Sequence, residues 1–186
     1  MRVIAGTARS IPLVAPEGKD TRPTTDRIKE TLFNILQGDI PGSVFFDVFS
    51  GSGAIGIEAL SRGAKRAIFI DNARPAIEAI TANVRKCRFE DRSEILKAEA
   101  APTVERLLAR VPGGDKLILF LDPPYDRGLE FSVLSAVRRS GRLSETDLII
   151  VETSLRADTA PFEELGYSIE REKCYKNQKH LFLRIS

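Results

Sequence analysis

The chain has 186 residues, 42% of them hydrophobic, and a formal net charge of +2 at pH 7. This size predicts one domain with one buried core and, at most, a small appendage. No apolar run approaches 18 residues and the start does not resemble a secretory signal, so we expect neither a membrane span nor export. Two cysteines, Cys87 and Cys174, and one histidine, His180, are too few for a Cys/His zinc site. They favour a reducing, cytoplasmic location and no metal, and monomer is the default expectation.

Both ends of the chain are basic. The first sixteen residues contain Arg2 and Arg9 and no acid, and residues 171–186 contain five basic residues and one acid, Glu172. Two interpretations stay open: an ordinary solvated surface, or a face that contacts phosphate groups.

Residues 1–23 read as a short strand-like opening section with turns at Gly6 and at 16–18. The next segment has apolar residues at helical spacing, which predicts a helix from about residue 26. Thr24 or Thr25 can cap it.

From residue 44 onward, strands and helices alternate. Strands are expected at 44–49, 66–71, 93–99, 116–122 and 147–153, helices at 54–62, 75–87, 101–110, 129–140 and 159–166, and a terminal hairpin at 167–175 and 179–185. This order predicts an α/β fold of the Rossmann-like kind, with about seven strands and helices on both faces of a mostly parallel sheet. Ligands of such sheets bind beyond the carboxyl ends of the strands.

The first strand leads into "DVFSGSGAIG", in which Gly51, Gly53 and Gly56 fit the pattern G-x-G-x-x-G. A dinucleotide site needs the following helix end free for an anionic pyrophosphate. Asp47, inside the strand and aimed at this loop, suits a cationic ligand better. The loop also lacks the lysine of a P-loop.

The next two strands end in candidate ligand contacts. Asp71 can accept hydrogen bonds from both hydroxyls of a ribose, although it or Asn72 could simply cap the following helix. Glu99, which is followed by Ala100, could accept a hydrogen bond from an adenine amino group. That Glu99 is an ordinary surface residue is nearly as plausible. Predicted contacts for a ribose, an adenine and a small charged tail together suggest that the ligand is S-adenosylmethionine (AdoMet). Phe49 and Ser50 of the glycine loop are further candidate contacts of this ligand.

The fourth strand runs into "LDPPYD", residues 121–126. Asp122 and the carbonyl oxygen of Pro123 are two acceptors that can hold an exocyclic amine and direct its lone pair towards a methyl donor. Pro123 and Pro124 stiffen this backbone, and Tyr125 offers a ring on which a flipped base can stack. Methyl transfer from a sulfonium needs mainly alignment.

The motif "DPPY" downstream of "DVFSGSGAIGIEALSRG" resembles the amino-methylating AdoMet enzymes. The block "RPTTDRIKETLFN" (22–34) and the start "RVIAGTARSIPL" resemble, more specifically, the RsmD-type bacterial 16S rRNA guanine-N2 methyltransferases. The resemblance implies a class I methyltransferase domain over 24–186, an amino-terminal β-hairpin extension over 1–23, and S-adenosylhomocysteine as product. It implies that the substrate is 16S rRNA within the small ribosomal subunit or its assembly intermediate. The family's acceptor after the third strand is often Asn or Asp, so Glu99 leaves the adenine contact open.

Four residues are candidates for RNA contact: Arg9 in the basic opening section, and Arg22, Thr24 and Arg27 at the start of the first helix. Three alternatives remain. An adenine-N6 methyltransferase shares "DPPY", an NAD-dependent oxidoreductase shares the glycine pattern, and a non-catalytic RNA-binding module shares the basic ends.

Overall fold

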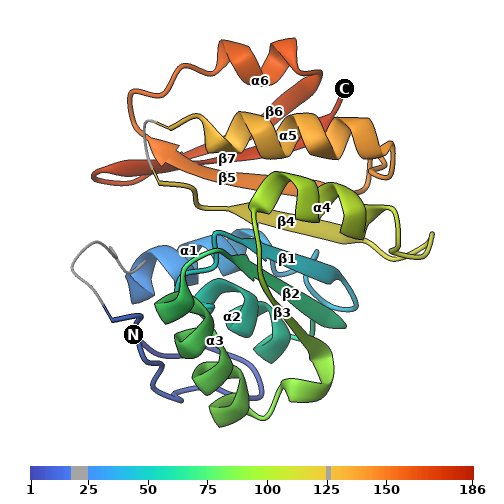
Figure 1. The fold of residues 1–186 in the computed structure, drawn as a ribbon. Coiled ribbons are helices and arrows are strands. Elements are labelled where there is room, and N and C mark those ends of the chain that lie inside the picture. Colours follow the sequence, from blue (N-terminus) through green and yellow to red (C-terminus); the bar gives the residue numbers. More distant parts are fainter. Residues whose placement is uncertain (18–24, 125–126) are drawn as a thin grey trace.

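The computed structural model describes residues 1–17, 25–124 and 127–186. One seven-stranded sheet runs through them in the order β3-β2-β1-β4-β5-β7-β6 (Figure 1). The strands are β1 Val44–Val48, β2 Arg66–Asp71, β3 Ser93–Lys97, β4 Leu117–Leu121, β5 Leu148–Ser154, β6 Tyr167–Cys174 and β7 Gln178–Ile185. The first five pair in parallel, and β7 is antiparallel to both β5 and β6. The predicted fold is confirmed, including the terminal hairpin.

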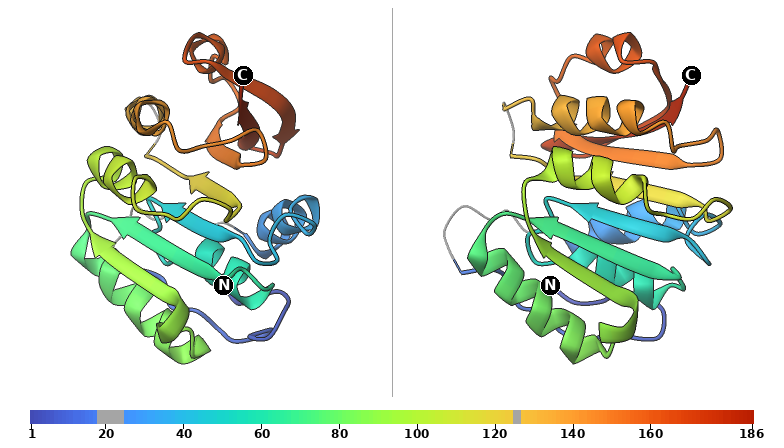
Figure 2. Two further views of the ribbon diagram at one scale, coloured as in Figure 1. Left: turned by 90° about the vertical axis from the view of Figure 1, so that its right-hand side faces the viewer. Right: turned by 45° about the vertical axis from the view of Figure 1, so that its right-hand side comes forward.

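Helices lie on both faces of this sheet (Figure 2). They are α1 Asp26–Ile35, α2 Ala54–Ser61, α3 Arg74–Cys87, α4 Ala100–Leu108, α5 Leu129–Ser140 and α6 Ala160–Glu164, with a short 3-10 turn, η1, at Glu90–Arg92. Alternate strand residues divide the core in two, because successive side chains of a strand point to opposite faces. Side chains of α1, α2 and α3 pack on one face, and those of α4, α5 and α6 on the other. No helix of the described residues is long and apolar enough to cross a membrane.

The strand order reverses direction between β1 and β4. The chain moves outward from β1 through β2 to β3, then returns to place β4 on the other side of β1. In open parallel sheets, such a reversal leaves a crevice at the carboxyl ends of the two central strands. The loops after β1 and β4, which carry the glycine motif and "DPP", therefore face one another across that crevice.

The described part of the opening segment, residues 1–17, is docked on α2. It contains one antiparallel bridge, between Arg2 and Pro12, and the backbone N–H of Thr7 donates to the carbonyl oxygen of Ser61 at 2.9 Å. Gly6 has a φ of +83°, and a Cβ there would lie 1.8 Å from the Ser61 carbonyl oxygen. Only glycine allows this approach of the two backbones. That residues 1–23 form a separate hairpin extension stays a prediction.

Candidate active site

A cavity of about 590 Å³ lies at the carboxyl ends of β1, β2, β4 and β5, within the size range of small-molecule sites. Its described lining includes five acidic residues and neither lysine nor arginine; the acids are Glu17, Asp47, Asp71, Asp122 and Glu152. Such a wall repels anions and attracts cations. The cavity therefore suits a small ligand that carries positive charge.

The glycine loop after β1 forms one wall of the cavity. Phe49, Gly51 and Gly53 all adopt left-handed backbone conformations, with φ of 62°, 56° and 74°. Ser50 fixes this turn, because its hydroxyl donates to the carbonyl oxygen of Asp47 at 2.5 Å and accepts the N–H of Ile70 at 2.9 Å. The backbone of the loop is thereby brought to the cavity, which Phe49, Ser50 and Gly51 line. Gly53 is not among the lining residues, but its N–H donates to the Ser50 carbonyl oxygen at 2.7 Å.

Asp47 lies beneath the loop and is almost fully buried. Its Oδ2 accepts the backbone N–H of Gly56, in the first turn of α2, at 2.9 Å. Burial raises the pKa of Asp47 to about 7, against the opposing effect of the Gly56 hydrogen bond, and the nearby charge of Asp71 raises it further. A cationic group bound beside Asp47 would lower this pKa again and favour the ionised carboxylate.

We expect Asp47→Asn to stabilise the ligand-free protein at pH 8 by on the order of 2 kcal/mol, and to have little effect near pH 4. The folded state holds the Asp47 proton up to about pH 7, whereas the unfolded state releases it near 3.8. Wild-type stability thus falls as pH rises through that window, and asparagine, which still offers an acceptor to Gly56, removes this loss.

Urea unfolding of the two proteins at several pH values measures this difference. Asp91→Asn, at an exposed position of η1, is the matched control and should show no such pH dependence. A stability difference for Asp47→Asn that is constant between pH 4 and pH 8 would contradict the prediction.

Asp71, at the end of β2, also lines the cavity. Its two carboxylate oxygens accept the backbone N–H groups of Gly51 and Ala73, each at 2.9 Å. The side chain therefore joins the glycine loop to the start of α3, and each oxygen keeps a second lone pair for a ligand. Asn72 lines the cavity next to it.

The predicted adenine contacts after β3 lie beside this wall. Glu99 and Ala100 are not among the cavity-lining residues, and the Oε1 of Glu99 accepts the side-chain amide of Asn72 at 3.4 Å. An adenine contact by Glu99 stays a prediction.

The "DPP" segment forms the opposite wall. Asp122, Pro123 and Pro124 line the cavity, and the N–H of Asp122 donates to the carbonyl oxygen of Val48 at 3.3 Å. Removal from solvent, together with the charges of Glu152 and Asp47, raises the pKa of Asp122 well above its usual value. A carboxylate of raised pKa is a better proton acceptor. Tyr125, the predicted stacking residue, lies outside the described residues.

Part of the cavity wall comes from the opening segment, which sequence reasoning did not assign to the site. Met1 and residues 15–17 line it. Asn83 of α3, which is fully buried, holds this segment in place: its side chain accepts the N–H of Val14 at 2.8 Å and donates at 2.9 Å to the carbonyl oxygens of Val14 and Ser52. Asn83 thus joins the opening segment to the glycine loop.

Glu152 is another lining residue that the sequence analysis did not assign to the site. It lies in β5, is almost fully buried, and its Oε2 is 2.8 Å from the Nε2 of His180 in β7. The sequence did contain a signal: like Asp47 and Asp122, this carboxylate ends a run of apolar strand residues, here "LIIVE".

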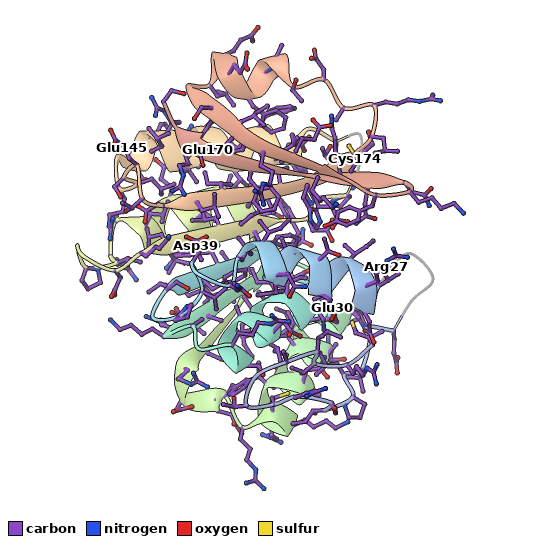
Figure 3. All side chains as sticks on the ribbon, turned by 180° about the vertical axis from the view of Figure 1, so that it is seen from behind. Arg27, Glu30, Asp39, Glu145, Glu170 and Cys174 are labelled. Carbon is purple, nitrogen blue, oxygen red and sulfur yellow. The ribbon has the colours of Figure 1, made fainter. Side chains whose placement is uncertain are left out.

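Two of the predicted RNA contacts, Arg9 and Arg27, are described by the structure and are not among the lining residues of the cavity. Arg9 and Arg27 are exposed, whereas Arg22 and Thr24 fall outside the described residues. Arg27 and Cys174, at the end of β6, lie on the same side of the molecule (Figure 3). That side is the carboxyl edge of the sheet, because Ser154 at the end of β5 pairs with Gln178 at the start of β7.

Not all of the basic tail is available to a partner. Lys179 is buried, with its Nζ 3.4 Å from Glu172, and Arg184 donates to Glu170 at 2.8 Å. Arg171, Lys173 and Lys176 are exposed. Lys179 and Arg184 are therefore paired within the protein, and both interpretations of the basic end stay open for Arg171, Lys173 and Lys176.

The family model described as Conserved hypothetical protein 95 matches residues 1–184. The protein of Escherichia coli K12 named Ribosomal RNA small subunit methyltransferase D is 33% identical over 173 residues, which covers 93% of this chain and 84% of the relative. Its namesake in Haemophilus influenzae is 36% identical over 157 residues, with 82% and 78% covered. The solved structure titled "Putative methyltransferase yhhF from Escherichia coli" matches with a TM-score of 0.80 at 30% identity, over 100% of this chain and 97% of that one.

Proposed function

This chain belongs to the family of Conserved hypothetical protein 95, the RsmD-type methyltransferases, and on that premise we propose that it transfers a methyl group from AdoMet to the exocyclic N2 amine of a guanine in 16S rRNA. The observation that carries the choice of cofactor is the acidic cavity without lysine or arginine among its described lining residues. AdoMet carries a sulfonium and an ammonium, whereas the pyrophosphate of NAD is anionic and would be repelled. The same wall thus argues against the oxidoreductase alternative.

The cofactor residues divide between the two ends of the ligand. Asp71 would accept the ribose hydroxyls, and Asn72, Glu99 and Ala100 would lie towards the adenine. The backbone of Ser50 and Gly51 would border the charged tail, above the buried carboxylate of Asp47, and Gly53 would hold the turn through its hydrogen bond to Ser50. AdoMet supplies an electrophilic methyl group, and its transfer leaves the neutral thioether S-adenosylhomocysteine.

Asp122 and the carbonyl oxygen of Pro123 would accept the two N–H bonds of the guanine amine. This fixes the amine with its lone pair directed at the methyl carbon, so most of the rate gain comes from alignment. As the new N–C bond forms, the C–S bond breaks and its electron pair stays on sulfur. The methylated nitrogen becomes acidic, and Asp122 or water takes its proton. Tyr125 would stack on the base.

The rRNA would reach this site over the carboxyl edge of the sheet. Exposed Arg27 lies on that side of the molecule (Figure 3). Exposed Lys173 lies near the end of β6 and Lys176 lies between β6 and β7. Arg9, Arg22 and Thr24 are further candidate phosphate contacts. The relatives named Ribosomal RNA small subunit methyltransferase D favour an rRNA substrate over the DNA substrate of adenine-N6 enzymes. The proposed setting is the small ribosomal subunit or its assembly intermediate, in the cytoplasm, with the enzyme as a monomer.

Nucleoside analysis of small-subunit rRNA from a strain that lacks this gene tests the proposal. We expect N2-methylguanosine to decrease and to return when the purified protein and AdoMet are added to the isolated subunits. Unchanged N2-methylguanosine, or loss of N6-methyladenosine instead, would reject the guanine assignment. Titration calorimetry should show binding of AdoMet and not of NAD. Parallel assays on subunits and free rRNA would establish which of the two is the substrate.

We expect Asn83→Ala to weaken AdoMet binding about tenfold, because it removes three hydrogen bonds that hold the opening segment against the glycine loop. Calorimetry measures this directly. Asn34→Ala, at an exposed position of α1, is the matched control and should bind AdoMet like the wild type. Equal AdoMet affinity in Asn83→Ala and wild type would show that the segment does not contribute to the cofactor site.

A further inference from the structure

Glu152 stands beside Asp122 at the wall of the cavity. Leu121 of β4 is the register partner of Val151 of β5, so the next residues of these parallel strands, Asp122 and Glu152, extend side by side from the same edge. Both line the cavity, and the side chain of Glu152 is only 5% exposed. The influence of Glu152 on the pKa of Asp122 is a second sign that the two carboxylates are close.

The neighbours of Glu152 fix its orientation. His180 lies directly opposite it in the β5–β7 pairing, is fully buried, and places Nε2 at 2.8 Å from the Oε2 of Glu152. The other ring nitrogen, Nδ1, is 3.3 Å from the hydroxyl of Tyr175, and the ring meets Phe120 edge-on at 5.8 Å. A carboxylate held in this way is a preorganised acceptor, because little freedom is left to lose when a ligand binds.

We propose that Glu152 is the specificity-determining residue that recognises guanine, by accepting its N1–H while Asp122 holds its N2 amine. The inference rests on the proposed guanine-N2 activity and adds to it the group that selects the base. Guanine presents two neighbouring kinds of donor on this edge, N1–H and the N2 amine, which match two neighbouring acceptors. Adenine presents an amine beside an N1 that has a lone pair and no hydrogen. The Glu152 carboxylate would repel that lone pair, so adenine would bind less well than guanine.

A purely structural role for the Glu152–His180 pair is the alternative. A structural pair contributes to folding but makes no distinction between purines. The two roles therefore separate in an experiment that varies the base and leaves the fold unchanged.

The test compares small subunits that are reconstituted with guanine or with 2-aminopurine at the position the wild-type enzyme methylates. 2-Aminopurine keeps the N2 amine but has a lone pair at N1 in place of the N1–H. We expect the wild type to prefer guanine in kcat/KM by about 10- to 100-fold, as expected for loss of one charge-assisted hydrogen bond. Glu152→Gln should lose about that factor on guanine and gain on 2-aminopurine, because its amide can donate to N1.

Two controls distinguish a loss of base recognition from a loss of folding or of AdoMet binding. The melting temperature and AdoMet affinity of Glu152→Gln should stay near those of the wild type, since glutamine keeps an acceptor for His180. Glu94→Gln, which alters a strand carboxylate paired with Arg66 near the amino end of β3, should retain the wild-type preference.

Each outcome decides a separate question. Equal rates of the wild type on the two bases would overturn the inference without any variant, even if Glu152→Gln fails to fold. An unchanged preference in a folded Glu152→Gln would assign selection to another group and leave the proposed function intact. If the wild type methylates the exocyclic amine of neither base, the proposed function falls, and the inference with it.

Discussion

Asp122→Ala is expected to lower methyl transfer to small subunits by about 10²- to 10³-fold while AdoMet binding changes little. Asp122 directly follows β4 and lines the cavity. When the Asp122 carboxylate is removed, the guanine amine loses both an acceptor that orients it and a group that can take its proton. The change in kcat should therefore be larger than the change in KM.

Comparison of Asp122→Ala with the more conservative Asp122→Asn makes this test more specific. Asp122→Asn keeps one acceptor oxygen and nearly the same volume, so its rate should fall between those of the wild type and Asp122→Ala. Asp91→Ala is the control, since this exposed carboxylate lies in η1, before the amino end of β3 and therefore at the opposite edge of the sheet. Activity of Asp122→Ala within tenfold of the wild type would remove Asp122 from the chemistry. A loss of folding would appear in the melting curve and is excluded by retained AdoMet binding.

The alternation of apolar runs with amphipathic segments was sufficient to predict the sheet and its helices. The expected strand at 66–71 and helix at 129–140 coincide with β2 and α5. Local periodicity predicts the positions of strands and helices because buried parallel strands are apolar along their whole length, whereas amphipathic helices are apolar on one side only. The same logic singles out Asp47 inside its strand and Asp122 at the end of its strand, because a carboxylate within or beside an apolar run needs a partner or a ligand.

What local patterns could not predict depends on contacts between distant segments. Nothing in "RVIAGTARSIPL" indicates that Met1 borders the cavity, because its position follows from hydrogen bonds to residues more than fifty positions away, on α2 and α3. Lys29 reads as a surface residue of an amphipathic helix, yet it is fully buried. Its burial depends on partners that only the tertiary structure supplies, the carboxylate of Glu58 and the carbonyl oxygen of Arg2.

Glu58 connects three parts of the fold at one buried carboxylate. Its oxygens accept the backbone N–H groups of Ile4 and Ala5 at 2.8 and 3.0 Å and the Nε of Arg62 at 2.8 Å. The Nζ of Lys29 lies 3.3 Å away. Burial lowers the pKa of Lys29, and the charge of Glu58 opposes that shift. The opening segment, α1 and α2 thus share one ionic centre.

Glu58→Ala is therefore expected to lower the free energy of unfolding by about 3–5 kcal/mol, because it leaves a buried ammonium without its counter-ion. That is a large part of the roughly 5–15 kcal/mol that holds a typical domain together. The opening segment would lose two of its hydrogen bonds to α2 as well. Since Met1 and residues 15–17 line the cavity, AdoMet affinity should fall along with stability.

Urea unfolding of the wild type, the single variants Glu58→Ala, Glu78→Ala and Lys29→Met, and the Lys29→Met/Glu58→Ala double variant measures the contribution of this centre. Glu78→Ala is the matched control, because Glu78 makes the same i,i+4 contact with an arginine, Arg74, but on the exposed side of α3. It should cost less than about 1 kcal/mol. Replacing Lys29 by Met in Glu58→Ala removes the stranded charge, so the double variant should be destabilised by clearly less than the sum of the two single changes. If Glu58→Ala cost no more than Glu78→Ala, the buried carboxylate would not be what holds the opening segment, and with it one wall of the cavity, in place.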